Sequence, residues 1–137
     1  MKILLTVDGS SHSQEAVDEV ARRPWPSRST VRVLSVVQPY TPPATEFVLA
    51  GATLEDIRRQ QTADAEHLTA RAADAVKAAD VSVETAVREG DPRSAIVDEA
   101  DEWGGSRLTA LHPTAMRTRR FLPGDEFVGG VGGLFVA

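Results

Sequence analysis

The densest group of chemically capable side chains follows the first apolar run of the chain. Asp8, Ser10, Ser11 and His12 stand within five positions, and their carboxylate, hydroxyl and imidazole groups are those of a hydrolytic triad. Neighbours in sequence rarely converge into a triad, and no Gly-x-Ser-x-Gly elbow is present. We therefore interpret these residues as solvated turn residues and predict no catalytic residue.

Metal and phosphate chemistry have weaker signals. The three histidines, which are dispersed, are His12, His67 and His112. Because the chain also has no Cys, we predict no metal site. The run from 129 to 133 contains four glycines but has neither dinucleotide-loop spacing nor the Lys of a P-loop. Three neighbouring arginines could bind phosphates, but such a group is more often part of a solvated surface: Arg117, Arg119 and Arg120.

Composition limits the class of protein. The 137 residues suffice for one domain, with 42% hydrophobic and 26% charged residues. The net charge is −5 and no basic stripe is present, so we expect no nucleic-acid partner. No apolar run reaches the roughly 18 residues of a membrane span, and we expect no membrane contact and a cytoplasmic location.

A composition break follows Trp103. Residues 1–103 carry a net charge of −7, whereas 104–137 carry +2 and contain seven of the ten glycines. We predict a single domain over 1–137, in which 1–104 is well patterned and 105–137 is a divergent, glycine-rich tail.

Two strands and a helix are predicted for the first part of the chain. Residues 2–7 form an apolar run of strand length, and 30–37 contain the β-branched residues of a second strand. Between them, Ser11 or Ser13 caps a helix that ends before Pro24. We expect Arg32 to lie at a sheet edge or strand end.

The second part repeats the alternation. Thr53 caps a long amphipathic helix that reaches about residue 79, and a strand follows over 81–87. Gly90-Asp91-Pro92 then supplies a turn, a cap and a first-turn proline. The next helix has its predicted buried face at Ile96, Val97, Ala100 and Trp103, and Gly104 ends it.

This alternation predicts an α/β fold, with one three-layer domain, a mostly parallel sheet and the order β-α-β-α-β-α-β before an irregular tail. Ligands of such sheets bind beyond the carboxyl ends of the strands. Asp8, Val36 and the turn 89–91 fall at those ends.

The ordered set of these segments resembles the universal stress protein family. The residues that carry the resemblance are Met1–Val7 with Asp8-Gly9-Ser10, Val33–Val37, Gly90–Val97 and Asp101–Gly104. The resemblance implies a Rossmann-like, adenine-nucleotide α-hydrolase-like fold and a homodimer. It also implies that the chain could bind ATP or AMP without vigorous hydrolysis.

The same resemblance divides the implied nucleotide site into two halves. Asp8, Gly9 and the backbone of Val36 match the half that meets adenosine. In the phosphate half, Gly124 takes the third glycine position of the family's loop. The other loop positions are degenerate and fall on Leu111, Thr114 and Asp125. A carboxylate at Asp125 would repel phosphate.

We therefore predict a non-enzymatic stress-response or regulatory domain with weak or lost nucleotide binding. One alternative is an ATP- or AMP-binding member with a rebuilt phosphate loop. A receiver-like domain is less consistent, since Asp8 stands alone and Asp91 fits a helix cap. A purely structural dimerisation module is the remaining alternative.

The tail has two open interpretations. It can be natural divergence, or it can be partly out of frame, since shifted codons of 104–107 and 127–134 can encode family-like residues. In the family, the last strand often pairs across the dimer. If 134–137 form that edge, removal of 129–137 should give a monomer.

Overall fold

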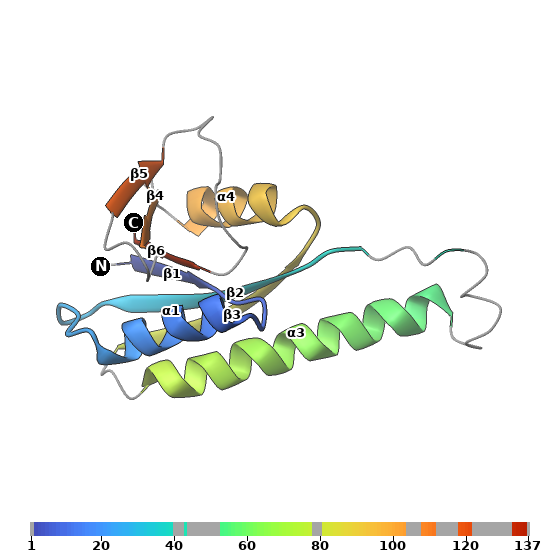
Figure 1. Cartoon of the computed structure of the whole chain (residues 1–137), viewed down its shortest axis with the longest axis horizontal. Coiled ribbons are helices and arrows are strands. Elements are labelled where there is room, and N and C mark those ends of the chain that lie inside the picture. Colours follow the sequence, from blue (N-terminus) through green and yellow to red (C-terminus); the bar gives the residue numbers. More distant parts are fainter. Residues whose placement is uncertain are drawn as a thin grey trace.

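The protein alternates strands and helices along the chain (Figure 1). The computed structural model describes residues 2–39, 43, 53–77 and 81–103, and the backbone of 108–111, 118–121 and 133–136. The elements are β1 (Lys2–Thr6), α1 (Ser11–Arg22), β2 (Thr30–Val37), α3 (Leu54–Lys77), β3 (Ser82–Glu89), α4 (Pro92–Trp103), β4 (Leu108–Leu111), β5 (Thr118–Phe121) and β6 (Gly133–Val136). The predicted α/β order is confirmed, and β5 is a strand that the sequence did not indicate.

One six-stranded sheet has the order β3-β2-β1-β6-β4-β5. β1, β2 and β3 are parallel neighbours. β6 is antiparallel to both β1 and β4, and β5 is antiparallel to β4. Four of the six strands, β1 to β4, therefore run in one direction. The tail strand β6 lies in the interior of the sheet and not at the edge on which the predicted cross-dimer role of 134–137 depended.

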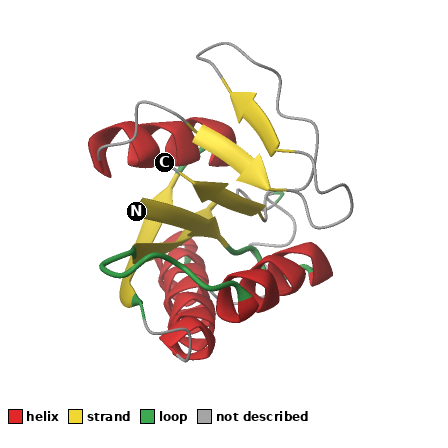
Figure 2. Cartoon of the chain, turned by 90° about the vertical axis from the view of Figure 1, so that its left-hand side faces the viewer, coloured by secondary structure: helices red, strands yellow, loops and turns green. Residues whose placement is uncertain are grey.

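Helices cover both faces of the sheet and make three layers (Figure 2). α1 and α3 lie on one face, where alternate residues of β1 and β2 pack into the larger core, among them Ile3, Leu5 and Val33. α4 lies on the other face, where Ile96 and Ala100 pack on Leu4 and Leu34. This period-two alternation is what places the end of β1 between two packed layers.

Hydrogen-bonded caps fix where the helices begin. Ser10 is the N-cap of α1 and accepts from the N–H of Ser13 at 3.2 Å, so the predicted cap at Ser11 or Ser13 is wrong by one to three residues. Thr53 and Asp56 form a reciprocal capping box at the start of α3, as predicted. Asp91 caps α4 through the N–H of Ser94 at 3.0 Å.

Two sequence predictions about side-chain direction are wrong on the α4 face. Val97, predicted as buried, is 44% exposed. Arg32 lies in the interior strand β2 and not at an edge, and its side chain is directed toward α4. Arg32 is accommodated in this interior position by a buried partner of opposite charge, because Glu99 of α4 is only 2% exposed.

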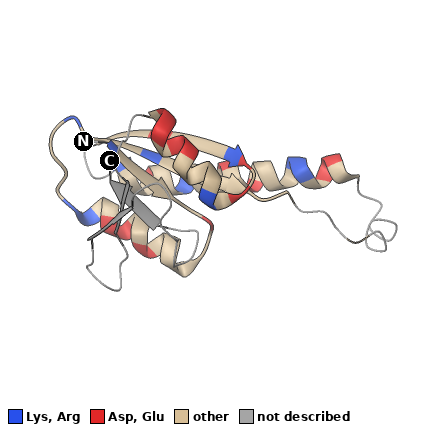
Figure 3. Cartoon of the chain, turned by 90° about the horizontal axis from the view of Figure 1, so that it is seen from above, with Lys and Arg blue, Asp and Glu red and all other residues tan. Residues whose placement is uncertain are grey.

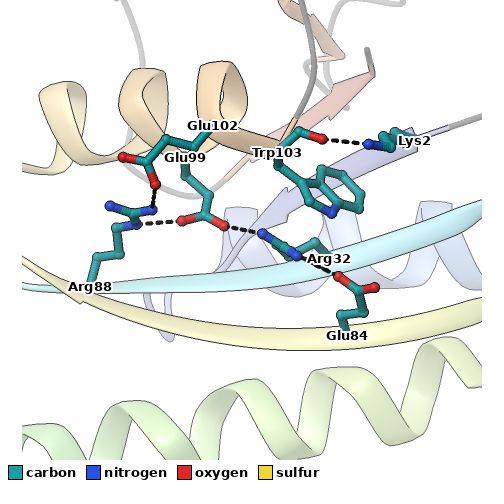
Figure 4. Close-up of polar contacts among 7 residues, drawn as sticks. All are labelled: Lys2, Arg32, Glu84, Arg88, Glu99, Glu102 and Trp103. Carbon is teal, nitrogen blue, oxygen red and sulfur yellow. Dashed lines mark hydrogen bonds and ion pairs between the residues drawn. The ribbon is translucent and has the colours of Figure 1, made fainter.

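Glu99 is the centre of an ion cluster, the Glu99 cluster, made of Arg32, Glu84, Arg88, Glu99 and Glu102 (Figure 4). Arg32 bridges Glu99 and Glu84, each at 2.6 Å. Arg88 bridges Glu99 and Glu102. The Arg32 guanidinium also lies over the Trp103 ring, 4.7 Å from its centroid. The cluster therefore links α4 to both β2 and β3.

Candidate functional site

The turn after β1 is organised by the Asp8 carboxylate. Its Oδ1 accepts hydrogen bonds from the N–H of Ser10 at 2.9 Å and from the Ser10 hydroxyl at 2.5 Å. Gly9 has φ +80°, a conformation that suits glycine. Partial burial alone raises the pKa of Asp8, but hydrogen bonds from Ser10 and Ser13 outweigh it and hold the pKa below its ordinary value. Asp8 is therefore an anion at the carboxyl end of β1, as predicted.

Val36 lies near the carboxyl end of the neighbouring strand. Thr6 of β1 is paired with Leu34 of β2, so the same register continued by two residues sets Asp8 beside Val36. The Val36 side chain packs on the α4-facing core, which contains Leu34 and Ile96. Because the Val36 side chain is occupied in this way, only the Val36 backbone remains available to a ligand at the strand end.

One cavity borders the Asp8 turn. It has a volume of about 360 Å³ and lies between α1 and α3. Gly9, Ser10, Ser13, Leu68 and Arg71 are among its lining residues. Arg71 supplies a cation to this cavity, whereas the N–H and hydroxyl donors of Ser10 are already bonded to the Asp8 carboxylate. Arg71 was not identified from the sequence, because an arginine at this position is typical of the exposed side of a helix.

A second cavity of about 630 Å³ lies at the carboxyl ends of β2 and β3, lined by Gln38, Pro39, Gln61, Gly90 and Asp91. The Oε1 atom of Gln61 is buried there without a hydrogen-bond partner. Gln61 lies on α3, for which the sequence predicted an amphipathic helix and no site residue. Neither cavity is lined by Asp8 or Val36.

The implied phosphate half falls mostly outside the described residues. Thr114, Gly124 and Asp125 belong to that part of the chain. Leu111 is described and ends β4, where it pairs with Thr118 of β5. Because β6 lies between β1 and β4, the ends of these two strands are two strand spacings apart, about 10 Å.

Other kinds of site have little support. In the part of the chain that the structure describes, no group of three or more His, Asp or Glu side chains could hold a metal ion. Hydrogen bonds from the N–H and hydroxyl of Ser94 hold the pKa of Asp91 below its ordinary value, as a helix cap requires. Acidic and basic residues alternate along α3, whereas acidic residues outnumber basic ones in α4 (Figure 3). None of the described helices combines the length and the apolar composition that crossing a bilayer demands.

The fold and the turn after β1 define an α/β domain of the adenine-nucleotide α-hydrolase-like class. The model of the universal stress protein family matches residues 1–108, most of the chain. The chain belongs to the universal stress protein family. The match ends beside the composition break that follows Trp103. A search of curated proteins gives no match.

Solved structures agree with this assignment. The hypothetical protein MJ0577, for which a structure-based assignment of biochemical function was made, is 19% identical with a TM-score of 0.62, over 77% of this chain and 69% of that one. The hypothetical protein PH0823 is 26% identical with a TM-score of 0.58, over 77% and 73%. Universal stress protein UspA from Lactobacillus plantarum is 25% identical with a TM-score of 0.53, over 75% and 70%.

Proposed function

We propose that this chain is a non-enzymatic universal stress protein that acts in the cytoplasm by association, with weak or lost binding of adenine nucleotides. Family membership supports the regulatory role. The acidic, cysteine-free composition supports the location. In this proposal the protein acts by association between copies, as the family resemblance leads us to expect, and not by catalytic turnover.

The observation that carries the nucleotide part of the proposal is the position of β6. A nucleotide crevice in an open parallel sheet lies between strands whose carboxyl ends meet at one edge. Next to β1, that place is taken by an antiparallel strand, which presents its start and not its end at the edge. Leu111, the one described residue of the implied phosphate half, is thereby set one strand further from Asp8.

The adenosine half keeps some capacity to bind. Ser10 makes both of its hydrogen bonds to Asp8 through Oδ1, so Oδ2 is the oxygen that would accept from a ribose or adenine donor. ATP should therefore bind no more tightly than adenosine. Each hydrogen bond to a charged phosphate that is lost costs about 1.5–3 kcal/mol, and about 1.4 kcal/mol is tenfold in affinity.

Calorimetry with ATP, AMP and adenosine tests this proposal. We expect three similar, weak affinities or no heat at all, and no release of phosphate from ATP over hours. Micromolar binding of ATP that adenosine does not share would overturn the loss of the phosphate half. Steady release of ADP would overturn the non-enzymatic assignment.

A second candidate function is favoured by Arg71. If ATP or AMP enters the 360 Å³ cavity, Arg71 and the Ser10 turn would replace the glycine loop as the phosphate site. Arg71→Gln should then remove the preference for ATP over adenosine. Arg58→Gln is the matched control, since Arg58 is an exposed arginine of the same helix outside the cavity.

A further inference from the structure

The free edge of β3 has an unusual arrangement of backbone and charge. β3 has eight residues without proline, and within the described residues it pairs only with β2. The N–H of Ser82 donates to Ser29 and that of Gly90 donates to Val37, so the even-numbered residues direct their backbone groups toward β2. Residues 83, 85, 87 and 89 therefore direct N–H and C=O groups away from the sheet. Such an edge is a template for a further strand.

Charged side chains usually protect an edge strand from pairing. Here the charges have opposite signs and are placed symmetrically about Ala86, with Glu84 two residues before it and Arg88 two residues after it. All three share the face that α4 covers, because side chains alternate along a strand. The Glu84 side chain is 47% exposed and that of Arg88 is 33% exposed, so both can reach beyond their own sheet.

We propose that β3 pairs antiparallel with β3 of a second copy about a two-fold axis at Ala86. In this register Glu84 lies opposite Arg88 of the second copy, and the reverse pair forms by symmetry. Thr85 lies opposite Val87 and supplies the backbone hydrogen bonds. The Glu99 cluster then extends across the interface, since Glu84 already joins Arg32 and Arg88 already joins Glu99 and Glu102 (Figure 4).

Registers shifted by one pair lose this charge match. With the axis at Thr85, Glu84 faces Ala86, and with the axis at Val87 it faces Gly90. The helices also allow the proposed register. α3 packs over both β2 and β3, about half a strand spacing from the edge, so the two α3 helices lie roughly 10 Å apart. That separation is ordinary for packed helices.

This inference rests on the association that the proposed function assumes, and it names the surface and the partner. The other expected surface, the strand at 133–136, is already paired on both sides within its own chain. β3 is thus an eight-residue edge strand with which a second copy of the chain can pair.

Cysteine cross-linking of the full chain tests the register, because the native chain has no Cys. Ala86→Cys places each thiol opposite its own symmetry mate in a non-hydrogen-bonded pair, with Cα atoms about 4.5 Å apart, within disulfide range. Ser82→Cys is the matched control on the same strand and face. In the proposed register residue 82 lies opposite residue 90 of the second copy, so the two introduced thiols are eight residues apart along the strand, about 26 Å. Mild oxidation should give a covalent dimer only for Ala86→Cys.

Light scattering of the unmodified chain and of Thr85→Pro supplies the second measurement. Thr85 directs its N–H outward, so proline there removes no bond to β2 but blocks the new strand. We expect a dimer for the native chain and a monomer for the variant, with unchanged circular dichroism. If Thr85→Pro fails to fold, the cross-linking pair decides alone.

Two outcomes overturn the inference and are distinguishable. A native dimer that Thr85→Pro leaves intact, with no cross-link at residue 86, shows that copies associate elsewhere, and the proposed function survives. A native monomer at every concentration overturns both this inference and the association on which the proposed function depends.

Discussion

Glu99 shows at the scale of one residue how a charge can replace apolar packing. Its side chain is 3% exposed and is held by Arg32 and Arg88. Burial alone raises the pKa of Glu99, but the hydrogen bonds from the two arginines outweigh it and hold the pKa below its ordinary value. A carboxylate whose pKa is lowered on folding stabilises the folded state above its unfolded pKa, and this stability is lost as pH falls through the folded value.

Glu99→Gln tests this account. The variant should lower the free energy of unfolding near neutral pH by about 1.5–3 kcal/mol, since charged hydrogen bonds are lost from a buried group. It should also flatten the fall in stability as pH drops below about 4.5, the ordinary pKa of a glutamate. Urea unfolding at several pH values measures both. Glu102→Gln is the control, because Glu102 is 64% exposed and its loss should cost less than about 1 kcal/mol. Equal losses for the two variants would contradict the central role of Glu99.

The start of α1 shows, at the scale of an element, what the sequence could and could not predict. The strand, the turn and the helix were all indicated by the apolar runs, by Gly9 and by Pro24. The cap was not, because Ser10, Ser11 and Ser13 are chemically alike and only the backbone geometry selects one of them. Ser10 alone lies within reach of both Asp8 and the Ser13 N–H.

Ser10→Ala should lower the free energy of unfolding by about 1 kcal/mol, as expected for the loss of an N-cap hydroxyl. Ser11→Ala should change it by less than about 0.5 kcal/mol, since Ser11 is exposed and lies one residue inside the helix. Thermal unfolding of the two variants separates them. A larger loss for Ser11→Ala would restore the cap that the sequence favoured.

Arg32 and Val97 mark the same limit on the opposite face of the sheet. A charged residue in a β-branched strand indicates an edge, and valine at a helical period indicates burial. The rule for Arg32 failed because Glu84 and Glu99, which are distant in sequence, compensate its charge only after β2, β3 and α4 meet. The candidate site has the same limit. Asp8 and Gly9 were predicted because they follow local turn chemistry, whereas Arg71 was missed because its place beside the turn depends on where α3 packs.

At the scale of the whole molecule, β6 completes the sheet, because it pairs with β1 on one side and with β4 on the other. Deletion of 133–137 removes hydrogen bonds on both sides of this strand. We expect the free energy of unfolding to fall by at least about 3 kcal/mol, at roughly 1 kcal/mol for each backbone bond. Urea unfolding and light scattering measure it, with deletion of residue 137 alone as the control. A stable, folded monomer after deletion of 133–137 would contradict the interior position of β6.

The pairing of β1 with β6 also has a consequence for the order of synthesis. Of the described strands, β1 is made before the others and β6 after them. A growing chain can join β1, β2 and β3 early, since domains fold as the chain emerges. The second side of β1 stays without its partner until β6 has left the ribosome. This closure is the most non-local pairing in the sheet, and such pairings are slow to form. Chaperone demand should therefore be greatest for chains in which β1, β2 and β3 have been made and β6 has not.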